Sequence, residues 1–275
     1  MNEKVALITG ASGGIGKEIA EKMLNKGYKV YGASRTEQKL QYLAERENGD
    51  YILLDVADEK SRERCVAEVL ARESRLDILI NNAGYGLLGA VEDIELDKAR
   101  EQFDVNLFGL AEMSRLVIPK MREQASGKII NISSIAGKTH IPFGGWYIAS
   151  KHALEGLSDV MRNELKNFGI DVVIIEPGAI KTNWGDIAAE NLLKHSGDGF
   201  YAEKAEKQAQ AFKEMYSDNG MAAEADQVAD TVIRAVESKK PSPRYTVPKQ
   251  AGFMLFLLKI LPDRAVDYLT DKIMN

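Results

Sequence analysis

Cysteine and histidine are both scarce in this sequence. Its 275 residues include one cysteine, Cys65, and three histidines, His140, His152 and His195. A single cysteine excludes an internal disulfide framework and favours a reducing compartment, so we expect a cytoplasmic protein. The histidines do not have the spacing of metal ligands, and Cys65 has no partner cysteine. We therefore expect neither a metal site nor thiol-based catalysis.

An excess of positive charge and long apolar runs are also missing. The formal net charge is −5, whereas a nucleic-acid-binding surface needs a basic stripe, so no nucleic-acid partner is expected. The longest apolar stretch, residues 251–261, is too short to span a bilayer and contains Lys259. Residues 1–4 lead directly into an apolar strand, without the pattern of a signal peptide. The overall composition, 45% hydrophobic and 28% charged, is that of an ordinary globular domain.

The N-terminal region has the pattern of a phosphate-binding loop. Residues 5–9 form an apolar run that predicts a strand, and an amphipathic helix is expected shortly after it. The connecting loop has the spacing G-x-x-x-G-x-G and contains Gly10, Ser12, Gly14, Ile15 and Gly16. Glycines allow the backbone to approach a pyrophosphate closely at the N-terminus of a helix. A glycine cluster alone can be a flexible turn, but its position between a strand and a helix favours phosphate binding.

The end of the second predicted strand bears on the choice of cofactor. Residues 29–33 predict this strand, and Arg35 follows it. NAD-binding units commonly place an acidic residue here for the ribose 2′-hydroxyl, whereas an arginine accommodates the 2′-phosphate of NADP. Residues 33–36 contain no acid, and Glu37 belongs to the next predicted helix. The sequence therefore favours NADP(H) over NAD(H), the alternative being that Arg35 is only a solvated side chain.

Strands and helices alternate along the rest of the chain. Further strands are predicted at residues 51–54, 76–80, 128–132, 171–175 and 244–247. Helices are predicted at residues 59–73, about 97–124, 146–168 and 225–237, the first with Cys65 in its apolar pattern. No linker or repeat interrupts the alternation. We predict a single α/β domain, residues 1–275, with a Rossmann-type doubly wound parallel sheet, helices on both faces and ligands at the carboxyl ends of the strands.

A serine pair and a Tyr-x-x-x-Lys pair lie in the central part of the chain. The strand at 128–132 leads to Ser133 and Ser134, and the next helix contains Tyr147 and Lys151 on one face, one turn apart. We expect the ammonium to pull the phenol pKa from about 10 toward neutrality, which would make the phenol a proton donor. The Ser134 hydroxyl would hold a substrate oxygen within reach of the Tyr147 phenol. Taken alone, Tyr-x-x-x-Lys also occurs by chance on amphipathic helices.

These motifs occur together in one order. They are the glycine loop, Asn81-Asn82-Ala83-Gly84, Asn106, Ser134, Tyr147-x-x-x-Lys151 and Pro177-Gly178. Together they resemble the short-chain dehydrogenase/reductase family over about residues 4–182. Residues 84–183 are also similar, more weakly, to its 17β-hydroxysteroid and retinol dehydrogenase-like branch. The resemblance implies an oxidoreductase that interconverts a carbonyl and an alcohol by hydride transfer with NAD(P).

The same resemblance implies a role for each matching residue. Tyr147 would be the general acid in reduction and the base in oxidation, and Lys151 would lower its pKa and hold the nicotinamide ribose. Ser134 would hydrogen-bond the carbonyl oxygen, and Asn106 would order a water in a proton relay to Lys151. The glycine loop, Tyr147 and Lys151 would contact the cofactor. Further implied contacts are Arg35, Asp55 and Val56 at the adenine side, and Asn82, Ala83 and Gly84 near the adenosine ribose. Pro177 and Gly178 would also contact the cofactor, with Ile180 and Thr182 at its carboxamide and phosphates.

Apolar residues surround the predicted catalytic group in the sequence. They are Tyr85, Leu87, Ile135, Ile141, Pro142, Phe143 and Trp146. They predict an apolar ketone, aldehyde or alcohol as substrate, steroid-like, retinoid-like or fatty-acyl, unless several pack inward. Residues 183–220 predict a helical lid, and residues 248–275 a C-terminal extension. The apolar part of this extension, residues 253–261, would pack on a partner subunit or cap the pocket, with membrane contact the least expected.

Two other functions remain open from the sequence. One is a catalytically silent protein that senses NADP(H), although the Ser, Tyr and Lys that catalysis needs are all present. The other is an NAD-dependent alcohol or hydroxysteroid dehydrogenase. In each case the family resemblance implies a homodimer or homotetramer.

Overall fold

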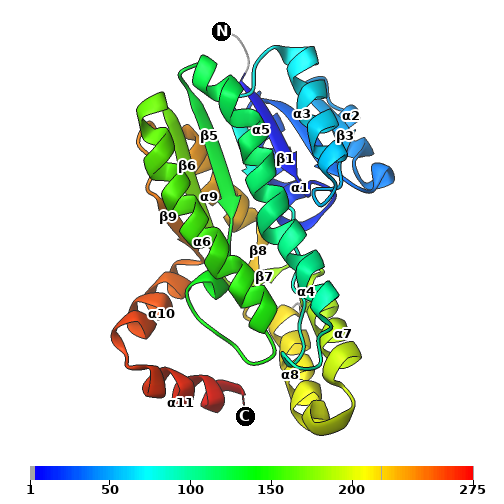
Figure 1. Ribbon diagram of the computed structural model, residues 1–275, viewed down its shortest axis with the longest axis vertical. Helices are drawn as coiled ribbons and strands as arrows, with labels where there is room; N and C mark the ends of the chain where they lie inside the picture. The colour runs from blue at the N-terminus through cyan, green and yellow to red at the C-terminus, as the bar shows by residue number, and fades with distance from the viewer. Residues whose placement is uncertain (1–3, 218, 275) are drawn as a thin grey trace.

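Seven parallel strands form the central sheet of the computed structural model, within the residues that the structure describes, 4–217 and 219–274 (Figure 1). Their order is β3-β2-β1-β4-β5-β6-β9, and each neighbouring pair is parallel. They are β1 (Val5–Thr9), β2 (Lys29–Ser34), β3 (Gly49–Leu53), β4 (Ile78–Asn81), β5 (Gly127–Ile132), β6 (Ile170–Pro177) and β9 (Arg244–Val247). The order reverses between β1 and β4, so the doubly wound sheet predicted from the sequence is confirmed.

Helices cover both faces of the sheet. They are α1 (Gly14–Asn25), α2 (Gln41–Ala44), α3 (Glu59–Glu73), α4 (Leu96–Phe103), α5 (Leu110–Glu123), α6 (Gly145–Leu165), α7 (Trp184–Ser196), α8 (Ala202–Tyr216), α9 (Ala225–Glu237), α10 (Lys249–Ile260) and α11 (Asp263–Met274). Two short strands, β7 (Ile180–Lys181) and β8 (Ala223–Glu224), pair apart from the main sheet. Helices α1 and α9 pack on one face of the main sheet, and α3, α5 and α6 pack on the other.

The strand sequences explain this layering. Alternate side chains of a strand point to opposite faces of its sheet. In β1, Ala6 and Ile8 belong to the core under α1 and α9, whereas Val5 and Leu7 belong to the core under α3, α5 and α6. A strand buried on both faces reads as a continuous apolar run. Cys65 packs in the second core, as expected, and burial raises the pKa of its thiol to about 12.

Local hydrogen bonds decide where some elements begin. Helix α3 begins at Glu59 because the Asp58 side chain accepts a hydrogen bond from the backbone N–H of Ser61 at 2.6 Å. The strand predicted from residue 76 begins only at Ile78. The Asp77 carboxylate accepts the backbone N–H of Val5 at 2.8 Å and binds the Arg75 guanidinium, so this residue serves as a strand-end cap.

The predicted helix at 97–124 contains an irregular turn. Helix α4 continues through a π-helical stretch, Asp104–Gly109, into α5. A Cβ at Gly109 would lie 2.3 Å from the backbone oxygen of Val56, so glycine is needed for the loop after β3 to approach this turn. Such π-turns occur often at functional sites, and this one contains the buried Asn106.

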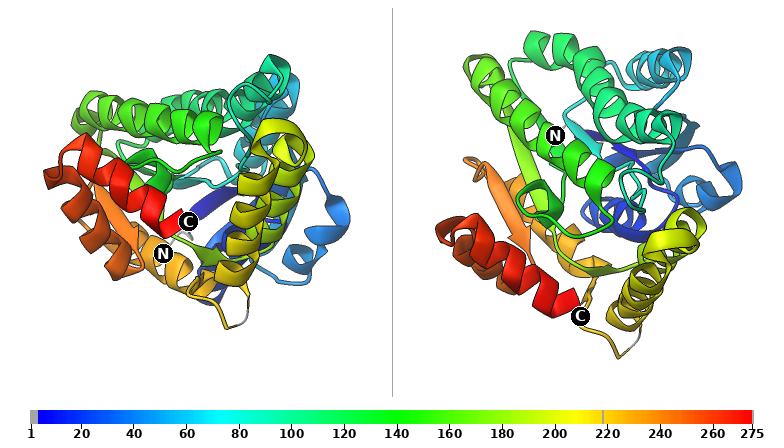
Figure 2. Two further views of the ribbon diagram at one scale, coloured as in Figure 1. Left: turned by 90° about the horizontal axis from the view of Figure 1, so that it is seen from below. Right: turned by 60° about the horizontal axis from the view of Figure 1, so that its bottom comes forward.

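Two pairs of helices lie beyond the carboxyl ends of the strands. Helices α7 and α8 stand on one side and α10 and α11 on the other, and both pairs extend past the end of the sheet (Figures 1 and 2). They correspond to the predicted lid region and C-terminal extension. Within residues 4–217 and 219–274, no helix combines the length and hydrophobicity that crossing a bilayer requires.

Candidate active site

The glycine loop after β1 is built so tightly that two positions need glycine. A Cβ at Gly16 would lie 2.3 Å from the backbone oxygen of Gly10, and a Cβ at Gly10 would lie 2.8 Å from Nδ2 of Asn82. Gly10 also has a φ of +69°, a conformation that side chains disfavour. The Asn82 amide donates to the backbone oxygens of Thr9 and Gly10, each at 3.1 Å. These contacts join the ends of β1 and β4 into one rigid surface.

The first turn of α1 has the features of an anion site. Its N-cap is Gly13, whose position provides no side-chain hydrogen bond, and its first turn has no acidic residue. The first backbone N–H groups of a helix lack intrahelical partners and attract anions. A Cβ at Gly14 would lie 3.1 Å from the Thr182 side chain, so Thr182 borders the same loop. The donor set fits the pyrophosphate of a dinucleotide, with Ser12 and Ile15 in the same turn.

The residues predicted at the adenine side lie at the ends of β2 and β3. These strands are neighbours, and Arg35 and Asp55 follow them. Arg35 is exposed. Burial raises the pKa of the Tyr85 phenol, and the positive charge of Arg35 opposes this shift. The Asp55 carboxylate accepts the backbone N–H of Ala57 at 3.0 Å, and Val56 is nearly buried. The fold therefore brings the predicted adenine and 2′-phosphate contacts to one edge.

Asn106 is held in place by the loop after β4. Its side chain accepts the backbone N–H of Tyr85 at 3.0 Å and donates to the Tyr85 oxygen at 2.9 Å and to Ser150 Oγ at 3.2 Å. Between Asn106 and Lys151 lies Gly84, where a Cβ would be 3.1 Å from Asn106 Oδ1 and 3.7 Å from Lys151 Nζ. The structure thus brings Asn106 and Lys151 to the same glycine. The water relay stays a prediction.

Ser134 is fixed where β5 and β6 end. It caps a short 3-10 helix, Ile135–Gly137, by accepting the backbone N–H of Ala136 at 3.1 Å. Its hydroxyl also donates to the backbone oxygen of Pro177 at 3.4 Å. Its neighbour Ser133 is buried, and its Oγ has no hydrogen-bond partner among the described residues. The two adjacent serines therefore have different surroundings.

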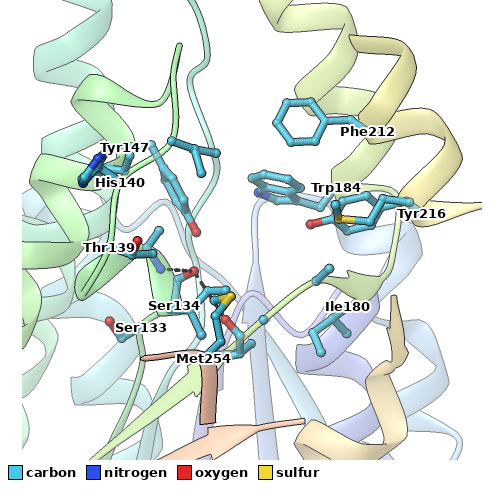
Figure 3. Close-up of a pocket in the computed structure, with 18 of the residues that line it drawn as sticks. Ser133, Ser134, Thr139, His140, Tyr147, Ile180, Trp184, Phe212, Tyr216 and Met254 are labelled. Atoms are coloured by element: carbon cyan, nitrogen blue, oxygen red, sulfur yellow. Dashed lines mark hydrogen bonds between the residues drawn. The ribbon is translucent and has the colours of Figure 1, made fainter. Parts of the chain in front are cut away.

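Tyr147 and Lys151 lie one turn apart on α6, and both are buried. Their exposed fractions are 8% and 6%. Lys151 Nζ donates to the backbone oxygen of Ile132 at 3.0 Å and lies 6.0 Å from the centroid of the Tyr147 ring. The Tyr147 hydroxyl points toward Ser134, and Trp184, Phe212 and Tyr216 face it from the opposite side (Figure 3).

The pKa directions differ from the expectation for this pair. Burial raises the pKa of the Tyr147 phenol, and hydrogen bonding with Ser134 opposes that shift. Burial also lowers the pKa of the Lys151 amine to about 8, while the charge of Glu155 opposes this change. The expectation that Lys151 brings the phenol pKa toward neutrality is therefore wrong for this structure. Removal from water favours the neutral form of both groups, and this effect dominates.

A cavity of about 490 Å³ opens beside Ser134 and Tyr147. It is lined by the loop after β5, by α6, by the loop after β6, by α7 and α8, and by α10 (Figure 3). The polar side chains in its wall include Ser133, Ser134, Thr139, His140, Tyr147, Thr182 and Gln208. The described residues of this wall include no Asp, Glu, Lys or Arg. The cavity therefore suits a neutral, largely apolar molecule.

Only part of this wall was predicted from the sequence. Ile135 and Ile141 line the cavity, as do Pro177, Gly178, Ile180 and Thr182. The other predicted apolar residues are outside the cavity wall. Tyr85, Leu87 and Trp146 form a separate cluster, and the Phe143 ring stacks edge-on against Tyr201. Their apolar surfaces are used to pack the loops instead, which the sequence had left open.

The part of the wall contributed by α10 was not predicted residue by residue. Met254, Leu257, Leu258 and Leu261 all line the cavity. Met254, Leu257 and Leu258 have the i, i+3, i+4 spacing of one helical face, and Leu261 directly follows the last residue of α10. This spacing can be read in the sequence, but α10 is apolar on other faces as well, so the pattern does not select this face. Of the roles considered for residues 253–261, capping the pocket is the one that these contacts match.

No group of His, Cys, Asp and Glu side chains in residues 4–217 and 219–274 is arranged to hold a metal ion. His140 instead lies with Nε2 3.3 Å from the Asp267 carboxylate of α11.

Comparison with known proteins gives a consistent result. A family model described as short chain dehydrogenase matches residues 4–192. A probable short-chain type dehydrogenase/reductase of Helicobacter pylori, VdlC, is 38% identical over 265 residues, which are 96% of this chain and 96% of that protein. An NADPH-dependent 3-dehydrocapnine reductase of Ornithobacterium rhinotracheale is 32% identical over 274 residues, covering 96% of this chain and 95% of that one.

Solved structures agree with this comparison. A short-chain dehydrogenase from Streptomyces avermitilis matches with a TM-score of 0.83 at 32% identity, covering 98% of this chain and 96% of that chain. The similarity therefore includes α10 and α11 as well as the sheet.

Proposed function

The chain belongs to the short-chain dehydrogenase family, and from this we propose that it is an NADP(H)-dependent oxidoreductase that interconverts an apolar ketone or aldehyde and its alcohol. One observation carries the proposal. The hydroxyls of Ser134 and Tyr147 face one another in the wall of a largely apolar cavity, at the carboxyl ends of the strands. A carbonyl carbon bound there would have its oxygen between two hydrogen-bond donors.

Tyr147 is the proposed general acid in reduction and the general base in oxidation. When bound, NADP(H) supplies or accepts the hydride. In reduction the Tyr147 hydroxyl donates its proton to the substrate oxygen, and Ser134 donates a hydrogen bond to that same oxygen as negative charge develops. The raised pKa keeps the phenol protonated at neutral pH, which is the form that reduction requires.

Lys151 supports this proton transfer in two ways. In its charged form it stabilises the phenolate that remains after Tyr147 has donated. An ammonium has three donors, and the structure uses one of them on the backbone oxygen of Ile132. The remaining donors are proposed to hold the ribose hydroxyls of the cofactor, and Asn106 is proposed to order a water that returns the proton through Lys151.

The glycine loop and Arg35 support the choice of NADP(H). The free N–H groups at the start of α1 suit the pyrophosphate, and the exposed Arg35 guanidinium suits a 2′-phosphate. Asp55, Val56, Asn82, Ala83, Gly84, Pro177, Gly178, Ile180 and Thr182 are proposed as further contacts. The relative from Ornithobacterium rhinotracheale is named as NADPH-dependent, which favours the same choice over NAD(H).

Residues 183–220 are proposed to act as a lid and residues 248–275 as an extension that completes the pocket. Trp184, Phe212 and Tyr216 contribute to one cavity wall and pack on one another, with Trp184 to Tyr216 ring centroids 5.5 Å apart. We also propose a cytoplasmic homodimer or homotetramer, as family membership and the single buried Cys65 favour.

The experiment that tests this function is a panel of neutral ketones and aldehydes with the purified protein and NADPH. We expect NADPH to be consumed with at least one aliphatic ketone and the matching alcohol to form. A protein that is stabilised by NADPH but consumes none across the panel would instead be a silent NADP(H) sensor. Stronger stabilisation and faster turnover with NADH would favour the NAD-dependent alternative.

A further inference from the structure

Helix α10 contributes an apolar wall to the cavity. Met254, Leu257 and Leu258 lie on one face of the helix, Leu261 directly follows its last residue, and all four line the cavity. Met254 and Leu257 nevertheless have exposed fractions of 38% and 40%. A side chain that both lines a cavity and contacts solvent stands at its opening. The cavity is therefore open along α10.

The opposite wall is mostly apolar and comes from α8 and the start of α7. It consists of Trp184, Phe212, Met215 and Tyr216, with Gln208 as its polar member. The Trp184 ring packs on Phe212 and Tyr216 and lies 5.9 Å from the Tyr147 ring, between centroids. Aromatic side chains therefore continue from Tyr147 through Trp184 to Phe212 and Tyr216.

The polar groups of the channel wall are mostly uncharged. Ser134 and Tyr147 lie at one end, no Asp, Glu, Lys or Arg is among the described lining residues, and the Nε2 atom of the lining residue His140 lies 3.3 Å from the Asp267 carboxylate. A substrate with a carboxylate or phosphate beside its carbonyl would lose hydration there without gaining a partner. Met215 and Met254 have unbranched, flexible side chains, so this part of the wall can adjust to the shape of its occupant.

We propose that this site takes an unbranched long-chain aliphatic ketone or alcohol, with the oxygen at Ser134 and Tyr147 and the alkyl chain running between α8 and α10 to the opening at Met254 and Leu257. The inference rests on the proposed function and narrows it from apolar carbonyls to linear chains. Each methylene that enters the channel leaves water for an apolar wall, which corresponds to an increase of roughly fourfold in kcat/KM.

The test uses the full-length protein, NADPH and a series of straight-chain methyl ketones, from methyl ethyl ketone to methyl decyl ketone. We expect kcat/KM to rise through the series, well past methyl butyl ketone, and a polycyclic ketone to be a poorer substrate than the longest chain. A maximum at methyl butyl ketone or shorter, or a preference for the polycyclic ketone, would overturn the inference. Turnover of short ketones would then leave the oxidoreductase function standing, whereas no turnover of any ketone would reject that function itself.

The position of the chain is tested by two matched substitutions on α10. Leu258→Trp fills the channel and is expected to shift the optimum to shorter ketones. Phe256→Trp is the control, because Phe256 is 61% exposed and lies outside the cavity wall. Met254→Trp serves as the second channel variant should Leu258→Trp fail to fold. An unchanged optimum in a folded channel variant, or an equal shift in the control, would show that the chain lies elsewhere.

Discussion

Lys151 Nζ lies 6.0 Å from the centroid of the Tyr147 ring, and both side chains are buried on one face of α6. The Lys151 amine donates a hydrogen bond to the backbone oxygen of Ile132, which holds the end of the lysine side chain in place. Burial raises the pKa of the phenol and lowers that of the amine to about 8. Near neutral pH the Tyr147 hydroxyl therefore keeps its proton, as carbonyl reduction needs. The Lys151 amine can gain or lose a proton close to this pH.

The depressed pKa of Lys151 predicts how stability depends on pH. Between about pH 8 and 10.5 the unfolded state binds more protons than the folded one, so the unfolding free energy rises with pH in this window. Below pH 8 both states are protonated, and the cost of burying the charge is fully present, roughly 3 kcal/mol. Replacing the amine removes this cost. We expect Lys151→Met to stabilise the cofactor-free protein near neutrality and to lose that advantage toward pH 10.5.

Urea unfolding of wild type and Lys151→Met across this pH range measures the effect. Lys60→Met, at an exposed position of α3, is the control and should follow the wild-type curve. A Lys151→Met curve parallel to wild type throughout would mean that the amine keeps its ordinary pKa.

Arg35 predicts the cofactor preference. Removing a charge-assisted hydrogen bond costs about 1.5–3 kcal/mol, so Arg35→Ala should weaken NADPH binding about 10- to 100-fold. NADH has no 2′-phosphate, and its Kd should stay within about twofold. Titration of both cofactors measures this, with Arg64→Ala on the exposed face of α3 as the charge-matched control. Equal losses for NADPH and NADH would remove Arg35 from the 2′-phosphate site.

The glycine loop predicts a contrast between two alanine substitutions. In Gly16→Ala the new methyl group would lie 2.3 Å from the Gly10 oxygen and 2.5 Å from Asn82 Nδ2, so the loop must move. We expect a loss of about 1–3 kcal/mol in stability and of most cofactor affinity. Gly13→Ala is the control, because its Cβ meets nothing within 4 Å and its backbone is extended. Thermal unfolding of both variants tests this. Similar melting temperatures would contradict the close approach.

The two adjacent serines predict another contrast. Ser134→Ala removes a proposed donor to the substrate oxygen and should lower kcat about 10²- to 10³-fold with little change in NADPH affinity. Ser133→Ala should keep kcat within about threefold, because the Ser133 hydroxyl is buried without a partner and its loss leaves no group unsatisfied. Steady-state kinetics of both variants with one ketone measures this difference in kcat. A larger loss for Ser133→Ala would transfer the role to that residue.

The sheet and the glycine loop were predictable because their signals are local. The strands are short apolar runs, and Gly10, Gly14 and Gly16 lie between a strand and a helix, so neighbours in sequence determine the structure. The π-turn around Asn106 was not predicted, and its close contact between Gly109 and the Val56 oxygen joins segments far apart in the sequence.

The pocket wall and the pKa directions depended on contacts between distant segments. The sequence predicted correctly that Tyr147 and Lys151 lie on one helical face. It did not predict that both side chains are buried, with Trp184 of α7 packed near the Tyr147 ring. Helix α10 is apolar around most of its circumference, so its pattern could not tell which face meets the cavity. Only the packing of residues far apart in the sequence selects Met254, Leu257, Leu258 and Leu261.

Tyr147 is proposed to transfer the proton while the rest of the site binds cofactor and substrate. Tyr147→Phe keeps the ring and its packing against Trp184 and removes only the hydroxyl. General acid catalysis contributes about 10²- to 10⁴-fold, so the variant should lose kcat by this factor and bind NADPH with nearly unchanged Kd. Parallel measurement of ketone reduction and NADPH titration in the folded variant is the direct test. A variant that retains most of its kcat would contradict the claim.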